Sequence, residues 1–138
     1  MGIDALRLRL NDKQSQMERV KSDNSALQDK VDALQRIYNE LKDAKNELSA
    51  LRNGVNHYAG KKYDLWAGHL YDQHFNRFLS RTLCGSYDYV IREIDRNMAK
   101  VNNERARSQN RILRNEGIIG NLKAAINTIV TQIQNWID

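Results

Sequence analysis

Apolar residues recur at alternating steps of four and three through the first half of the chain. Seven of the first nine positions reached from Leu6 are apolar: Leu6, Leu10, Lys13, Met17, Val20, Asn24, Leu27, Val31 and Leu34. After a slip of one residue, the row continues through Ile37, Leu41, Ala44, Leu48, Leu51 and Val55. A 3.5-residue repeat places such a row along one side of a helix. The pattern predicts a helix over about residues 3–54.

The second half carries a longer row with the same repeat. Thirteen of its sixteen positions are apolar: Cys84, Tyr87, Ile91, Ile94, Met98, Val101, Arg105, Ser108, Ile112, Asn115, Ile119, Leu122, Ile126, Ile129, Ile133 and Trp136. A row of this length predicts a second helix, over about residues 65–137, with a sustained partner. A kink is expected near Gly85, because glycine weakens a helix interior by about 1 kcal/mol relative to alanine.

The segment between the two rows has no clear period. Asn53-Gly54 resembles a helix end, because glycine commonly follows the last helical residue. Asp64 is a suitable N-cap for the helix that follows. We therefore expect a connection over about residues 55–64, within a single domain spanning residues 1–138.

Polar residues within the two rows indicate how the helices pair. In an antiparallel hairpin, facing residues have a constant sum of residue numbers. Asn24 with Arg105 sums to 129 and Lys13 with Asn115 sums to 128, which places the tip near residue 64. Matched polar positions would avoid leaving a polar group buried alone, although so few pairs can also match by coincidence. The fold predicted is all-α: a long antiparallel two-helix hairpin resembling a coiled coil.

The second row is widened by apolar residues beside it. Ile112, Ile119, Ile129 and Trp136 are accompanied by Leu113, Ile118, Val130 and Ile137, respectively. One interpretation is a broader contact inside the hairpin. The other, which we favour, is a surface for a second chain, because an exposed apolar patch usually marks a binding site.

Composition narrows the functional classes. The chain of 138 residues has no proline, one cysteine, and a net charge of +5 with both signs interspersed, which is typical of solvated helix faces. Basic residues gather over residues 92–114, so nucleic-acid binding is an alternative, although the charges spread around the helix and a solvated face explains them better. Neither a signal-peptide pattern nor a membrane-span pattern is present. We expect a protein made in the cytosol, without a cleaved signal peptide, that stays there or is exported with its partner.

The sequence lacks the patterns that carry chemistry. His57, His69 and His74 do not have the spacing that would place two metal ligands on one helix face. Cys84 lies in the apolar row without an evident base, which favours a small buried side chain over a nucleophile. We expect no enzymatic activity, no metal and no cofactor.

The residues after the connection contain a Trp-x-Gly motif, Trp66-Ala67-Gly68, followed by Phe75. On physical grounds, these residues suit a cluster that caps the tip of the hairpin. Two long helices joined at a Trp-x-Gly also resemble the WXG-type small proteins of type VII secretion. The length of the chain is closer to the YwqH-like helical proteins of Gram-positive bacteria, which accompany LXG-type toxins.

This resemblance implies an adaptor that binds the helical targeting domain of an LXG-type toxin, keeps it stable and supports its export, with room for a second small helical protein. Trp66, Gly68 and Phe75 would then belong to the interaction surface. The family's Tyr-x-x-x-Asp/Glu export pattern is met at Tyr89 and Glu93, although such a pattern is common on helix surfaces. A self-associating structural coiled coil is the main alternative function.

Overall fold

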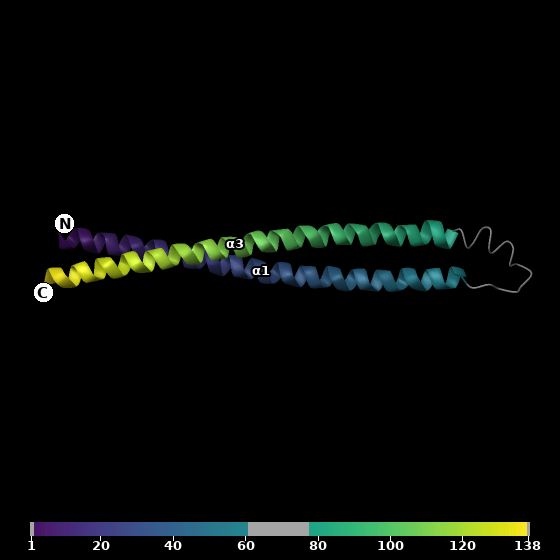
Figure 1. Ribbon diagram of the computed structural model, residues 1–138, viewed down its shortest axis with the longest axis horizontal. Coiled ribbons are helices and arrows are strands. Elements are labelled where there is room, and N and C mark those ends of the chain that lie inside the picture. Colours follow the sequence, from purple (N-terminus) through teal and green to yellow (C-terminus); the bar gives the residue numbers. More distant parts are fainter. Residues whose placement is uncertain (1, 61–77, 138) are drawn as a thin grey trace, which may run out of the picture. The chain divides into compact units, whose positions relative to one another are not determined.

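The computed structural model describes residues 2–60 and 78–137. These residues form helix α1 (Ile3–Gly60), a π-helical segment η2 (Phe78–Leu83) and helix α3 (Cys84–Ile137). The described parts contain no strand, and α1 packs against α3 in antiparallel direction (Figure 1). The predicted all-helical hairpin is therefore confirmed. No helix in the described ranges is both long and apolar enough to cross a bilayer.

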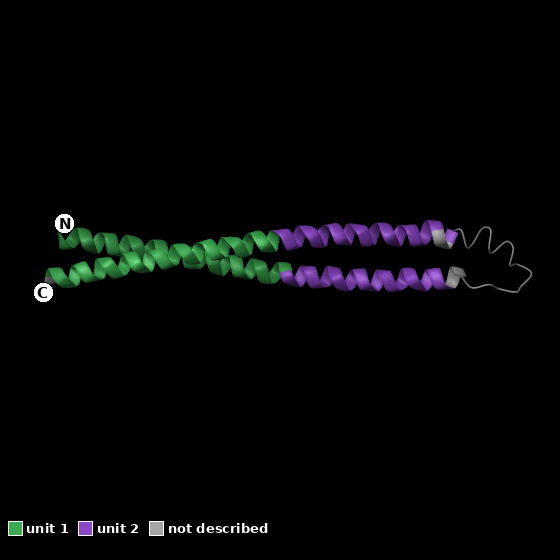
Figure 2. Ribbon diagram, in the orientation of Figure 1, with its two compact units in different colours: residues 1–34, 104–138 green, residues 35–103 purple. Residues whose placement is uncertain are grey.

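Contacts divide the chain into two compact units, where we had expected one domain. Unit 1 combines residues 1–34 with residues 104–138, and unit 2 comprises residues 35–103 (Figure 2). Each unit contains one segment of α1 and one of α3. The two units are described separately below.

The core of each unit is the row of residues along which α1 and α3 meet, which we call the seam. In unit 1, its buried apolar residues are Leu6, Leu27, Val31, Leu122 and Ile129. In unit 2, they are Cys84 and Ile91. Every member of the predicted row of α3 from Cys84 to Ile133, including the polar Ser108 and Asn115, is buried or half-buried. The last member, Trp136, is exposed.

The end of α1 differs from the prediction. We expected the helix to stop at about residue 54, but it continues to Gly60, so residues 55–60 are helical. Gly54 does not adopt the positive φ of a helix-terminating glycine, and the half-buried Val55 continues the seam. Packing beyond the glycine therefore outweighs its low helix propensity, about 1 kcal/mol. The predicted tip near residue 64, Asp64 and the start of the second helix lie outside the described residues.

The irregular backbone lies just before the expected kink. The six residues of η2 form a π-helix, and regular α-helix begins at Cys84 and includes Gly85. A π-helix inserts extra backbone into a helix and is a recognised cause of bending. The glycine is therefore not where the helical geometry changes.

The seam of α1 in unit 2 also differs from the prediction. The predicted slip after Leu34 is wrong, because Ile37 and Leu51 are exposed. The half-buried positions continue the steps of four and three without interruption: Tyr38, Leu41, Lys45, Leu48, Arg52 and Val55. This register places two cationic side chains, Lys45 and Arg52, in the seam.

The pairing of the helices is antiparallel, but not in the predicted register. The Asn24 side chain donates to the backbone carbonyl of Ile112 at 3.5 Å, and Asn115 donates to Asp23 at 2.7 Å. The predicted pairs, Asn24 with Arg105 and Lys13 with Asn115, are therefore wrong. The partner of Asn24 is displaced by seven residues, or one heptad. A heptad row fits equally well after such a shift, so apolar periodicity cannot determine the register.

We predict that Ile129→Ala lowers the free energy of unfolding by about 2–4 kcal/mol, because it removes a core side chain and leaves a cavity. Ile129 is only 2% exposed. Leu113→Ala is the matched control on the same helix, with an expected effect within about 0.5 kcal/mol, because Leu113 is 63% exposed. Urea unfolding followed by circular dichroism measures both. Equal effects would contradict the described seam.

Candidate protein-interaction surface

Two cations occupy seam positions of α1 in unit 2, and each reaches a carboxylate of α3. The Lys45 ammonium lies 2.7 Å from Asp95, and a guanidinium nitrogen of Arg52 lies 2.7 Å from Asp88. In heptad notation, Lys45 and Arg52 occupy a positions, and Asp88 and Asp95 occupy e positions beside the seam. The hydrocarbon stems can therefore lie along the seam while the charges reach its edge.

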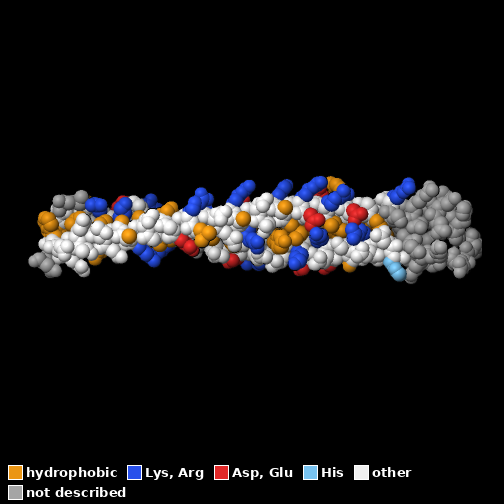
Figure 3. All heavy atoms as spheres, in the orientation of Figure 1, with side chains coloured by type: hydrophobic (Ala, Val, Ile, Leu, Met, Phe, Trp, Pro, Cys, Tyr) orange, Lys and Arg blue, Asp and Glu red, His pale blue; other side chains and the backbone are white. Residues whose placement is uncertain are grey.

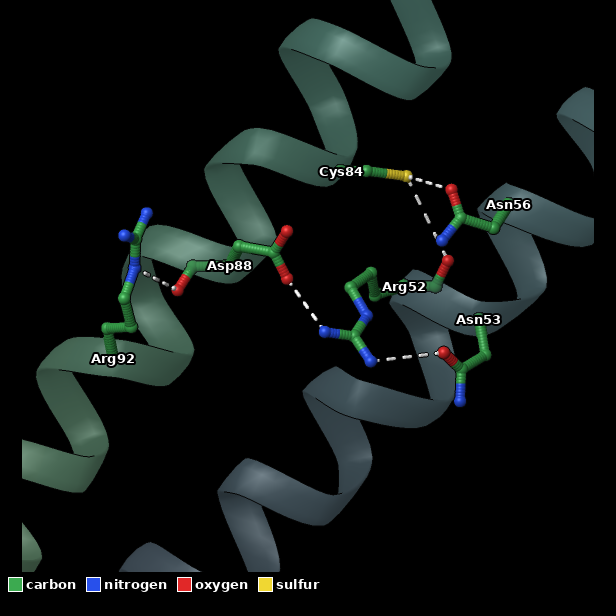
Figure 4. Close-up of polar contacts among 6 residues, drawn as sticks. All are labelled: Arg52, Asn53, Asn56, Cys84, Asp88 and Arg92. Atoms are coloured by element: carbon green, nitrogen blue, oxygen red, sulfur yellow. Dashed lines mark hydrogen bonds and ion pairs between the residues drawn. The ribbon is translucent and has the colours of Figure 1, made fainter.

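Figure 4 shows how Arg52 is held. One guanidinium nitrogen donates to Asp88, and the other donates to Asn53 at 3.3 Å. The Cys84 thiol donates to the side-chain oxygen of Asn56 at 3.0 Å. Arg92 donates to the backbone carbonyl of Asp88 at 3.4 Å. The polar contacts of this end of unit 2 thus gather around the seam arginine and its e-position partner.

The opposite edge of unit 2 is apolar. It consists of the g positions of both helices, and we call these residues the apolar edge: Ile37, Ala44, Leu51, Leu83 and Val90. Ile37, Leu51 and Val90 are exposed, whereas Ala44 and Leu83 are half-buried. In α3, Asn97 follows Val90 at the next g position. This edge was missed by the sequence analysis, which had assigned Ile37 and Leu51 to the seam.

A shallow groove runs beside this edge. Its volume is about 290 Å³, and it is lined by Leu48, Leu83, Ser86, Tyr87 and Val90. Four of the five lining residues are apolar or aromatic. Figure 3 shows that hydrophobic side chains also reach the visible face of the molecule among charged ones. The groove and the apolar edge together form a surface suited to a helix rather than to a small polar ligand.

In unit 1, polar residues at several g positions are joined across the seam. Asp23 accepts from Asn115 and lies 3.4 Å from a guanidinium nitrogen of Arg111. Lys30 lies 2.6 Å from Glu104, whose other oxygen lies 3.5 Å from Arg107. Ion pairs thus cover this stretch of the g edge, whereas Ile118, at a later g position of α3, is an exposed apolar residue.

The predicted interaction residues of α3 do not form one continuous surface. Ile112 and Ile119 are half-buried in the seam and Ile129 is buried there. Leu113 and Ile118 are exposed and Val130 is half-buried. Because Leu113 occupies a b position and Ile118 a g position, they project to different sides of α3.

Trp136 lies at the end of unit 1, 58% exposed. It lines a groove of about 370 Å³ with Leu6, Arg9, Gln132 and Asn135. This groove is more polar than that of unit 2, since three of its five lining residues carry amide or guanidinium groups. It therefore offers less apolar surface to a partner helix.

Trp66, Gly68 and Phe75 lie outside the described residues, as does the side chain of Ile137. Of the export pattern, Tyr89 is exposed and Glu93 forms an ion pair with Arg96 in the next turn. This intrahelical pair gives Glu93 a structural partner within α3.

Three of the basic residues over residues 92–114 of α3 are paired with acidic side chains. Arg96, Arg107 and Arg111 form ion pairs, and Arg105 is half-buried in the seam. Within the described ranges, no group of three or more His, Cys, Asp and Glu side chains is arranged to hold a metal ion.

No protein-family model, no curated protein and no solved structure matches this chain.

We predict that Lys30→Met raises the pKa of Glu104. The hydrogen bond from Lys30 is the largest cause that lowers this pKa from its ordinary value of 4.5, and the charge of Lys30 is the next. Partial desolvation raises the pKa, and Arg107 lowers it further. Glu104 thus stabilises the fold above its unfolded-state pKa, and this contribution is lost as pH falls through its lower folded-state pKa. Solvent screens the exposed pair, so the effect on stability is small.

Carboxylate NMR titration measures the shift directly. Lys21→Met, which removes a charge from an exposed position of the same helix, is the control and should leave the Glu104 titration unchanged. An unchanged titration in the Lys30 variant would contradict the described pair.

Proposed function

We propose that this protein is a helical adaptor that binds the helical targeting domain of an LXG-type toxin and supports its stability and export. The observation that carries the proposal is the apolar edge of unit 2, whose Ile37, Leu51 and Val90 remain exposed after α1 and α3 have packed together. Exposed apolar residues along one edge of a helix pair are typical of a surface for another helix. The resemblance to the helical proteins of type VII secretion supports the kind of partner.

The thin core of unit 2 also supports a binding role. Its α1 seam contains Tyr38, Lys45 and Arg52 where unit 1 has Met17, Asn24 and Val31 at equivalent heptad positions. Only Cys84 and Ile91 are buried apolar residues within the described part of unit 2. An additional helix would remove further apolar surface from water, contributing about 25 cal/mol per Å².

We expect the chain, co-expressed with the helical domain of an LXG-type toxin, to co-purify with it as a stable complex. Combined Leu51→Gln and Val90→Gln substitutions should abolish co-purification, because both side chains are exposed on the apolar edge. Leu8→Gln combined with Leu113→Gln is the matched control, since it removes two exposed leucines from unit 1.

Circular dichroism must show the same helix content and melting for both double variants. Retention of the complex by the Leu51/Val90 variant would contradict the role of this edge. Failure of the unaltered chain to bind any LXG-type helical domain would refute the adaptor function.

A further inference from the structure

We propose that the apolar edge of unit 2 accepts one helix of a different protein, whose apolar heptad stripe is flanked by Lys and Arg. This inference rests on the proposed function only in taking the edge as a binding surface. It adds the chemistry of the bound helix and excludes a second copy of this chain as the occupant.

The spacing of the apolar edge fits a helix with a 3.5-residue repeat. Ile37, Ala44 and Leu51 succeed one another at intervals of seven residues, as do Leu83 and Val90. Each interval corresponds to roughly 10.5 Å along a helix. A third helix with the same repeat can therefore place an apolar residue at each level of the edge, beginning with the groove beside Val90.

The outer borders of this edge are acidic. Glu40 and Glu47 occupy the c positions of α1 next to the edge, and both are exposed. Glu93 occupies the corresponding position of α3 and also pairs with Arg96. The residue numbers of the pairs Lys45–Asp95 and Arg52–Asp88 both sum to 140. Glu47 and Glu93 have the same sum, so they lie at the same level, on opposite sides of the edge.

These carboxylates determine which flanking residues a bound helix can carry. Positions beside the apolar stripe of the bound helix would lie near Glu47 on one side and Glu93 on the other. Lys or Arg there gains attraction, whereas Asp or Glu meets like charge. Lys100, at the c position that follows Glu93 in α3, lies opposite Glu40, because this pair also sums to 140. The negative charge of the borders is therefore strongest around the groove, at the level of Glu47 and Glu93.

The same charges disfavour a second copy of this chain. A two-fold contact through one surface brings that surface against itself. With the dyad at the groove, the Glu47 and Glu93 borders of one copy would face the same carboxylates of the other. The observed charge pattern therefore favours a basic helix from another protein.

The test uses the full chain and two designed 28-residue helical peptides. Both have the same Leu/Ile stripe, flanked by Lys in one peptide and by Glu in the other. Fluorescence anisotropy at low salt should show at least about tenfold tighter binding of the Lys-flanked peptide, equivalent to about 1.4 kcal/mol. The preference should shrink at 1 M salt, where the screening length falls to about 3 Å.

Charge reversal tests the assignment of the acidic border. Glu40→Lys combined with Glu47→Lys should reduce or invert the preference between the peptides. Glu18→Lys combined with Asp29→Lys makes the same change in net charge at exposed positions of unit 1 and should leave the preference intact. Leu51→Gln should weaken binding of the Lys-flanked peptide about tenfold.

Equal binding of the two peptides, or an equal response to both charge reversals, would overturn the inference. It would also be overturned if the chain alone formed a dimer that Leu51→Gln converts to a monomer, because a second copy would then occupy the edge. Peptide preference without toxin binding would refute the proposed function alone. Toxin binding without a preference would refute this inference alone.

Discussion

The pairing of two seam cations with two carboxylates governs how α1 and α3 meet in unit 2. Lys45 and Arg52 occupy positions where a coiled coil normally places apolar residues, and an isolated charge there would be strongly disfavoured. Asp95 and Asp88 lie at the neighbouring e positions, each 2.7 Å from its cation. The long side chains can therefore leave the seam at one particular edge. A shift by one heptad would break both pairs and could re-form only one, because Asp88 and Asp95, like Lys45 and Arg52, are seven residues apart. These contacts therefore favour the observed register among those that apolar packing alone leaves equivalent.

This arrangement also explains why the two edges of unit 2 differ. Because the cations and their partners occupy the e edge, the g edge needs no polar groups to complete the helix pair. Ile37, Leu51 and Val90 then remain exposed there. In unit 1, the seam positions Leu27 and Val31 are buried and apolar, and the ion pairs join g positions instead, as in Lys30–Glu104. The apolar g edge of unit 2 thus accompanies ion pairs at its e edge, whereas in unit 1 the ion pairs lie at g positions.

The sequence was sufficient to predict two long helices and the whole seam of α3, because sixteen positions with one repeat leave little choice of face. The antiparallel direction was also predicted, but from the pairs Asn24–Arg105 and Lys13–Asn115, which the structure does not form. It was insufficient for the seam of α1 after Leu34. There, an apolar count favours Ile37, Ala44 and Leu51, whereas uninterrupted spacing favours Tyr38, Lys45 and Arg52. A seam that contains Lys45 and Arg52 is reasonable only if Asp95 and Asp88 pair with these cations. Recognising those pairs requires knowledge of the register in which the two helices meet. The register depends on polar pairs such as Lys45–Asp95 and Lys30–Glu104, whose acidic members lie outside the apolar rows.

The energetic consequence is that the register of the helix pair in unit 2 is well defined although the pairing contributes little free energy of folding. Partly exposed ion pairs contribute roughly 0–1 kcal/mol each, so Lys45 and Arg52 define the pairing without replacing the burial that apolar residues would provide. A helix bound at the apolar edge would supply that missing burial and, by excluding water, strengthen nearby electrostatic interactions. Binding and folding would then be coupled in unit 2, because a ligand that binds only the folded state stabilises that state by mass action. A charged seam beside an exposed apolar edge is the pattern expected if the chain reaches its full stability only when the proposed helix is bound.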